Sequence, residues 1–403
     1  MIKYLMRFIF FVIFVIFVFI IQVNSINISS CAATYTISSP GTYEVTGNLV
    51  TTTNCIRIES DNVTLNCQGY VLDGDVSGLD YAISDNFNSP SNVTIKNCHV
   101  KDFWHGFYFF GSNISIYNSS SSLNIFNGFN FGGGSNLLID NFSSYSNGFN
   151  NFELSSISSG IFNNILLNDS SDGYGARILN SNNIIFNNSK VSDNDEYGLL
   201  LFSVLNSSFY NTIVSLGQGS GIYLENSHNN LFENMSLIDN LGVSGADSYS
   251  GGFNLRNSNS NILRNSNISN NKKFNLIPLN FYFRNTSGNI VYGNFIDNGS
   301  TILAYNWSEN SDFFSYNGVG NFYSDFVCIE NSTGNDGIYE YEICTNQSFY
   351  TINSTYGIVD DSPLFSLIKT IYIPSMDGSD SSFLPFGNLF FPLIFIVGLF
   401  LLF

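Results

Sequence analysis

The sequence predicts an all-β solenoid, a parallel β-helix of about 10–12 coils within residues 61–310. An apolar segment that ends in asparagine recurs about every 21 to 24 residues, for example NVTIKNC at 92 and NIIFNNS at 183. A glycine-led segment keeps the same interval, as in NGFNFG at 127 and YGLLLF at 197. Apolar and polar residues alternate in both segments, with no helical period of 3.6 residues. Because units this short cannot bury an apolar face alone, each strand must pair with its equivalent in the next coil.

Two other repeat folds fit the pattern less well. A leucine-rich repeat has a similar length, but it requires L-x-x-L-x-L and a helical or 3₁₀ segment, and these Phe- and Ile-rich units contain neither. A β-propeller requires blades of about 40 residues. The β-helix is therefore the expected fold.

Each predicted coil has an inward strand position and two bends. The expected inward residues are Ile95, Ile116, Ile139, Phe162, Phe186 and Phe209. The expected corner residues after that strand are Asn97, Asn118, Asn141, Asn164, Asn188, Asn211 and Asn234. Asparagine tolerates a left-handed backbone, and its amide can bond to the same amide one coil away. At the other bend a positive φ or close packing would exclude a Cβ atom. The glycines expected there are Gly106, Gly128, Gly148, Gly175, Gly198, Gly221 and Gly252.

The two ends of the chain indicate export. Residues 1–25 have the basic start, apolar run and small polar end of a signal peptide, and an uncleaved anchor helix is the alternative because the run is long. Residues 385–403 are apolar enough for a transmembrane anchor or a removable sorting tail. Between them we expect an N-terminal cap at 26–60, a closing segment at 311–366 and a linker at 367–384. The expected location is the cell surface, with the protein secreted and membrane-anchored.

Six cysteines fit an oxidising compartment, because their number is even and none forms a CxxC zinc motif. We expect Cys328 to pair with Cys344, and Cys31, Cys55, Cys67 and Cys98 to pair among themselves. Sequons for N-glycosylation are also frequent. The candidate glycosylation sites are Asn62, Asn92, Asn113, Asn141, Asn168, Asn187, Asn206, Asn234, Asn267, Asn285, Asn306 and Asn331.

Composition excludes one class of partner. The chain has 13 Lys and Arg residues against 31 Asp and Glu residues, for a net charge of −18. Without a basic patch it cannot release counterions from phosphates, so we expect no nucleic-acid partner.

Longer stretches resemble a known group. CIRIESDNVTLNCQGYVLDG at 55, NVTIKNCHVKDFWHGFYF at 92, GNFYSDF at 320, NDGIYEYEI at 335 and DDSPL at 360 are similar to archaeal secreted right-handed parallel β-helix repeat proteins. These form a NosD-like, carbohydrate-binding and sugar-hydrolase β-helix group. The resemblance covers about residues 31–365 and implies a right-handed, single-stranded β-helix that binds carbohydrate. The copper role of some members does not transfer, because copper delivery needs clusters of Met, Cys or His ligands. Met235 and Met376 are isolated. Of the histidines, His99 and His105 lie around one coil corner with Trp104, and His228 lies in a separate coil.

A catalytic β-helix would need convergent carboxylates, or bound calcium with an Arg or Lys base. Counting back from Gly175 and Gly198 puts Asp172 and Asp195 at one position of adjacent coils. The low-probability catalytic candidates are Asp172, Asp195, Glu196, Arg177 and Lys190. The weak calcium candidates are Asp169, Asp172, Asp193 and Asp195. The alternative is that these are solvated turn residues, since aspartate favours turns. No cofactor is expected.

Aromatic residues form the other candidate surface, because sugar C–H faces stack on rings. The expected surface aromatics are Trp104, Phe107, Tyr108, Tyr117, Tyr145, Tyr174, Tyr197, Tyr210 and Tyr223. The alternative is that about half of them cap the interior. Together these observations favour a non-catalytic structural or adhesive protein that binds carbohydrate or another cell-surface polymer. The competing expectation is a surface polysaccharide lyase, epimerase or hydrolase.

Overall fold

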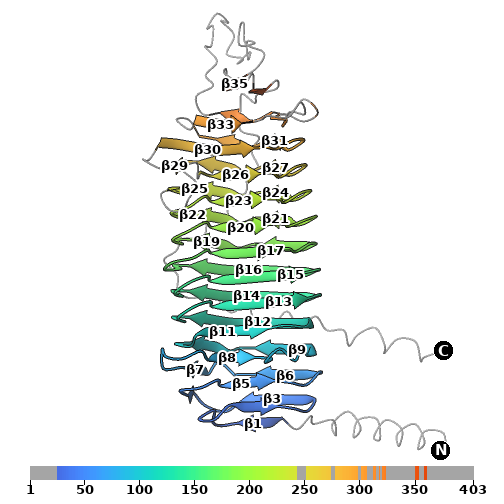
Figure 1. Ribbon diagram of the computed structural model, residues 1–403, viewed down its shortest axis with the longest axis vertical. Coiled ribbons are helices and arrows are strands. Elements are labelled where there is room, and N and C mark those ends of the chain that lie inside the picture. Colours follow the sequence, from blue (N-terminus) through green and yellow to red (C-terminus); the bar gives the residue numbers. More distant parts are fainter. Residues whose placement is uncertain are drawn as a thin grey trace, which may run out of the picture. The chain divides into compact units, whose positions relative to one another are not determined.

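The computed structural model describes residues 25–242, 251–273, 277–297, 301–305, 312–314, 317, 320–323, 350–353 and 358–360. All of them belong to one compact unit, Met1–Ile373. The regular elements of these residues are strands, and successive coils stack in chain order from β1 (Ile26–Ile28) upward (Figure 1). The prediction of a parallel β-helix is confirmed.

Each coil contributes two stretches to a 21-stranded sheet and one stretch to a 13-stranded sheet. The first stretch of the successive coils is β3 (Gly41–Val45), β6 (Val63–Asn66), β9 (Ser91–Lys96), β12 (Ser112–Ser122), β14 (Leu137–Tyr145), β16 (Gly160–Asn168), β18 (Ile184–Asn187), β21 (Ser208–Tyr210), β24 (Leu231–Glu233), β27 (Ile262–Arg264) and β31 (Ile290–Tyr292). The second stretch is β4 (Leu49–Val50), β7 (Val71–Asp73), β10 (His99–Lys101), β19 (Lys190–Ser192), β22 (Ile213–Ser215), β25 (Ser236–Ile238), β28 (Asn267–Ser269), β32 (Phe295–Ile296) and β34 (Phe322–Tyr323). The longer strands β12, β14 and β16 run through both stretches.

The 13-stranded sheet carries the third stretch of each coil. Its parallel strands are β2 (Tyr35–Ile37), β5 (Ile56–Ile58), β8 (Tyr81–Ser84), β11 (His105–Phe109), β13 (Phe129–Gly134), β15 (Phe152–Ile157), β17 (Ala176–Leu179), β20 (Leu199–Phe202), β23 (Ile222–Glu225), β26 (Phe253–Arg256), β30 (Ile277–Arg284) and β33 (Thr301–Tyr305). The short β29 (Lys272–Lys273) pairs antiparallel with β30, and β35 (Tyr350–Asn353) pairs antiparallel with β36 (Ile358–Asp360).

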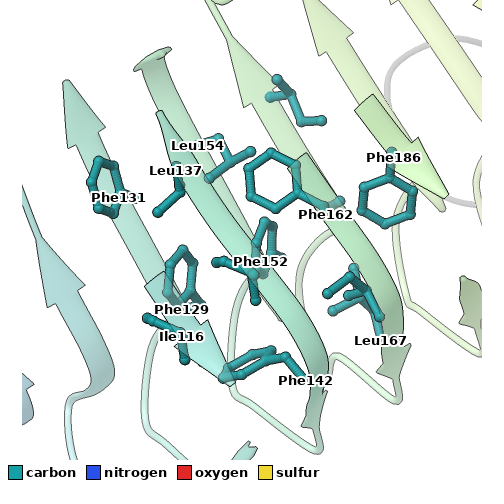
Figure 2. Packing of buried hydrophobic residues seen from close by; sticks show 14 of the residues in the cluster. Ile116, Phe129, Phe131, Leu137, Phe142, Phe152, Leu154, Phe162, Leu167 and Phe186 are labelled. Carbon is teal, nitrogen blue, oxygen red and sulfur yellow. The ribbon is translucent and has the colours of Figure 1, made fainter. Parts of the chain in front are cut away.

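The core lies between the two sheets, and its side chains stack in register. Ile95, Ile116 and Ile139 are direct strand partners and fully buried, and the ladder continues through the predicted phenylalanines. From the 13-stranded sheet, Phe129 and Phe152 stack with ring centroids 4.6 Å apart and planes 10° apart. Figure 2 shows these rings interleaved with Ile116, Leu137, Phe142, Leu154, Phe162, Leu167 and Phe186. The predicted inward ladder is confirmed.

The predicted asparagine corner is also confirmed. Asn97, Asn118, Asn141, Asn164, Asn188, Asn211 and Asn234 all have positive φ, between 47° and 56°. Several donate an amide N–H to the coil before, as Asn141 does to Asn118 at 2.9 Å and Asn234 does to Asn211 at 3.1 Å. Left-handed backbone costs most residues about 1–2 kcal/mol, and asparagine lowers that cost through local hydrogen bonding.

The predicted glycine bend is confirmed with one exception. A Cβ atom at Gly175 would lie 2.3 Å from Val191, and one at Gly198 would lie 2.2 Å from Val214, so close packing selects glycine. Gly148 does not belong to this series. Because Phe129 pairs with Phe152 and Phe152 with Ala176, Asn151 occupies the bend of that coil.

Two disulfides join the N-terminal coils. Cys31 bonds to Cys55 and Cys67 bonds to Cys98, so these four cysteines pair among themselves. The expected Cys328–Cys344 pair lies outside the described residues, as do Asn306, Asn331, the signal peptide through residue 24, the linker and the C-terminal apolar segment. Within the described part of the chain no helix has the length and hydropathy to span a membrane.

Candidate functional site

Within the described part of the chain, the outer face of the 13-stranded sheet carries polar and aromatic side chains that can take part in chemistry. Strand pairing places one outward residue of each coil in a single row, which we call the central column. The central column consists of Tyr108, Asn130, Glu153, Arg177, Leu200 and Tyr223. Its neighbours on each strand, such as Phe107 and Phe109, point into the core and are fully buried, as the two-residue period of a strand requires.

An ion pair lies in the middle of the central column. Glu153 and Arg177 are strand partners, and Arg177 Nη1 lies 3.0 Å from Glu153 Oε1. The other carboxylate oxygen, Oε2, accepts N–H groups from Asn127 at 3.0 Å and Asn150 at 2.7 Å. The Glu153 side chain is 14% exposed and that of Arg177 is 33% exposed. Both carboxylate oxygens of Glu153 thus accept hydrogen bonds, and the residue holds an accessible guanidinium in a fixed place.

Two tyrosines lie near this pair. Burial raises the pKa of Tyr174, the charge of Glu196 raises it further, the charge of Arg177 lowers it and that of Glu153 raises it. Burial also raises the pKa of Tyr108, with smaller contributions from Tyr81, Asp85 and Glu153. Both hydroxyls therefore remain protonated at neutral pH and can donate a proton or a hydrogen bond.

An aromatic cluster surrounds His105 at the N-terminal end of this face. The His105 ring stacks on Tyr81 with centroids 5.7 Å apart and contacts Tyr108 and Phe126 at 5.0 and 5.3 Å. Its Nδ1 atom is buried with no hydrogen-bond partner, and burial lowers the pKa of His105 to about 4. The imidazole is neutral at physiological pH. Nearby, burial raises the pKa of Asp85 to about 6.

The predicted aromatic surface is confirmed only in part. Trp104, Tyr108, Tyr117, Tyr174 and Tyr210 are half-buried and Tyr145 is exposed. The prediction is wrong for Phe107, because this residue occupies an inward strand position of the core. Tyr197 and Tyr223 are buried against each other, with parallel rings 4.8 Å apart.

The predicted pair of stacked aspartates is not formed. The backbone N–H groups of the consecutive residues Asp195 and Glu196 donate to the carbonyls of Ser170 and Gly173, so Ser171 and Asp172 lie between the acceptors and have no counterpart between the donors. From the paired Asp169 and Asp193, the first coil takes seven residues to reach the next strand pair and the second coil takes six. Asp172 lies in this longer turn and is exposed. Counting back from Gly175 and Gly198 assumed two turns of equal length, and it therefore placed Asp172 opposite Asp195.

The remaining predicted residues are spread over different surfaces. Asp169 and Asp193 both have positive φ, and Asp169 accepts a hydrogen bond from Ser146 at 2.7 Å, as expected of corner residues. Lys190 is on β19 in the 21-stranded sheet, whereas Arg177 is on the 13-stranded sheet and pairs with Glu153. Among the described residues no three His, Cys, Asp or Glu side chains form a group able to hold a metal ion.

The right-handed parallel β-helix is also the class that comparison with known proteins indicates. Residues 82–246 match the family model described as a right handed beta helix region. No curated protein matches the sequence.

Solved structures of the same architecture are similar to this chain. The A-module of mannuronan C-5 epimerase AlgE4 from Azotobacter vinelandii is 15% identical, with 68% of this chain and 83% of that chain covered and a TM-score of 0.53. The AlgE6 A-module from the same organism is 16% identical, with 72% and 89% covered and a TM-score of 0.55. The catalytic domain of a GH87 alpha-1,3-glucanase is 14% identical, with 72% and 63% covered and a TM-score of 0.38. At these identities the likeness to the two epimerase modules shows the fold alone.

The comparisons correct the main functional expectation from the sequence. A non-catalytic structural or adhesive protein was expected, but the similar solved β-helices are enzymes that act on polysaccharides, so the competing expectation is the better supported one. The expectation rested on the lack of a stacked Asp–Asp set. It overlooked the Glu153–Arg177 pair, whose residues come from different coils and become neighbours only through strand register.

Proposed function

We propose that this protein is a polysaccharide-modifying enzyme that binds a uronate-containing chain on the outer face of the 13-stranded sheet. The reaction would move a proton at the carbon next to the sugar carboxylate, as an epimerase or a lyase does. The observation that carries the proposal is the Glu153–Arg177 pair, with Tyr174 within range of its charges. The likeness to mannuronan C-5 epimerases supports the substrate class.

Arg177 would bind the substrate carboxylate. A guanidinium has five N–H donors, so it can keep its bond to Glu153 and still make a bidentate contact with a second carboxylate. Its charge would stabilise the negative charge that develops on the substrate when the adjacent C–H proton passes to a solvent water or hydroxide at this open face. Glu153, fixed by Asn127 and Asn150, would act as a positioning residue for Arg177.

Tyr174, whose phenol is protonated at neutral pH, would donate a proton to the opposite face of the same carbon in epimerisation or to the leaving glycosidic oxygen in elimination, and would regain it from solvent. Glycoside hydrolysis would instead need a carboxylic acid that protonates the leaving oxygen, with a second carboxylate facing it. Glu153 does not suit that acid role, because one cation and two amides already donate to its oxygens. The site therefore favours epimerisation or elimination over hydrolysis.

The direct test is an activity assay on the purified full chain. Polymannuronate, polyguluronate, polygalacturonate and a neutral alpha-1,3-glucan would each be followed by absorbance of unsaturated products, by NMR of C5 epimers and by reducing ends. We expect product from at least one uronate polymer and none from the glucan. Turnover should rise between about 10 and 150 mM salt, because screening weakens repulsion between the polymer and a chain of net charge −18.

Arg177→Lys keeps the charge but loses the planar fork, so we expect a decrease in kcat/KM of about 100-fold. The matched control is Arg256→Lys. Arg256 is likewise a strand partner of a glutamate, Glu225, with N and O atoms 3.7 Å apart, but it lies in another part of the sheet. Equal activity of the two variants, or release of reducing ends from the glucan alone, would refute the proposal.

A further inference from the structure

A second row of residues runs beside the central column, at the turn that leads into the 13-stranded sheet. We call it the entry column, and it consists of Trp104, Phe126, Phe149, Gly173, Glu196 and Gly219. Backbone hydrogen bonds of 2.9 Å join Phe126 to Trp104 and Phe149 to Phe126, and a bond of 3.0 Å joins Glu196 to Gly173. Each member also lies three residues before a residue of one paired row in the 13-stranded sheet, so all six occupy the same place in their own coils.

The first three members form a stack of parallel rings. The Trp104 and Phe126 rings have centroids 5.4 Å apart and planes 2° apart, and the Phe126 and Phe149 rings are 4.7 Å and 12° apart. All three side chains are half-buried. Since the rings lie face to face along the direction of coil stacking, the outer face of Phe149 is directed toward the following coil.

That following coil has no side chain at this place. A Cβ atom at Gly173 would lie 2.6 Å from the Phe149 carbonyl carbon, so backbone contact excludes any larger residue. One coil further on, the column resumes with Glu196, and Gly219 again excludes a side chain after it, at 2.5 Å from Tyr197. Phe149 and Glu196 thus carry successive side chains of the column, on backbone positions that are two strand spacings or about 10 Å apart.

We propose that the Phe149 ring, the glycine position at 173 and Glu196 form a subsite for a pyranose unit next to the one held by Arg177. This inference rests on the proposed function and names a specificity element of the same face. A sugar ring can stack its C–H face on Phe149 and direct its hydroxyls to the Glu196 carboxylate. A carboxylate at that position repels a second carboxylate, so the subsite selects a hydroxyl-bearing edge of the polymer.

The subsite adjoins the reaction centre. Tyr174 follows Gly173 directly, and its hydroxyl senses the charges of Glu196, Arg177 and Glu153. The Tyr174 hydroxyl is therefore within electrostatic range of both the cation that would bind the acidic group and the carboxylate that would bind hydroxyls. A polymer in this place would present an acidic edge to Arg177 and an uncharged edge to Glu196, which sets its orientation on the sheet.

The test is a kinetic series on uronate oligosaccharides of two to eight sugar units, with the full chain and three variants. Glu196→Gln removes the charge at nearly constant shape, and we expect it to raise KM about tenfold on the longer substrates with kcat changed less than twofold. Phe149→Ala should raise KM by about 2- to 10-fold, the worth of one aromatic stacking contact. Asp195→Asn, the same charge change one residue away, is the matched control and should leave KM unaltered.

Binding distinguishes failure of the subsite from failure of the proposed function. If the wild-type protein turns over none of the polymers, titration of the oligosaccharides by intrinsic tryptophan fluorescence and by calorimetry still reports the subsite. Weaker binding by Glu196→Gln and Phe149→Ala, with Asp195→Asn unchanged, supports it. Unchanged KM and binding in both variants, or a decrease confined to kcat in Glu196→Gln, would overturn it.

Discussion

The asparagine corner and the entry column occur once in every coil of the same solenoid, yet they differ in what they preserve. At the asparagine corner the successive coils from Asn97 to Asn265 repeat one residue type with one backbone conformation, and several of the amides bond to the coil before. In the entry column the side chain changes from aromatic to glycine to carboxylate within a few coils. The first feature requires repetition because it holds the stack together. The entry column does not repeat one residue type, and the groups suited to chemistry lie where its side chains change.

The largest expected effect is on the free energy of unfolding, and it distinguishes a buried ring from a half-buried ring of the same coil. Phe152 is fully buried and stacks on Phe129, so Phe152→Ala should lower the free energy of unfolding by about 3–5 kcal/mol. Phe149→Ala in the same coil removes a half-buried ring and should cost about 1–2 kcal/mol. Urea unfolding measures both, and equal losses would show that the entry column is part of the core.

Next in size is the pH dependence that His105 introduces. Its folded pKa of about 4 lies below the ordinary value of 6.5, so the unfolded chain binds this proton first as the pH falls. The resulting loss of stability reaches about 3 kcal/mol near pH 4 and is absent above pH 6.5. Asp85 acts in the opposite direction between pH 6 and 4, because its folded pKa of about 6 is above the ordinary value.

The change that reveals the histidine contribution is His105→Gln. The variant should gain stability relative to wild type as the pH falls from 7 to 4, because it lacks the His105 contribution while those of Asp85 and the other titrating groups remain. Urea unfolding at pH 7, 5.5 and 4 gives the two curves. Parallel curves would mean that His105 titrates normally in the folded protein.

Much of the fold could be predicted because its determinants are local and recur. Alternation of apolar residues gave the inward ladder, and asparagine marked a left-handed corner wherever it followed that strand. The site could not be predicted in the same way. With Gly148 placed in the glycine series, Glu153 is displaced from Arg177, whereas the strand register makes them partners. An alignment of NFEL at 151 with GARI at 175 would have shown the opposite charges side by side.

The smallest effect tests the repeating side of the comparison. Asn211 has a φ of 48°, donates to Asn187 at 2.9 Å and accepts from Asn234 at 3.1 Å, and it lies outside any sequon. Asn211→Ala should cost about 1–2 kcal/mol, because alanine meets the steric cost of the left-handed region and loses both amide bonds. Asn211→Gly keeps the backbone freedom and should cost less. If glycine is as destabilising as alanine, the amide bonds rather than the backbone conformation determine the asparagine at this corner.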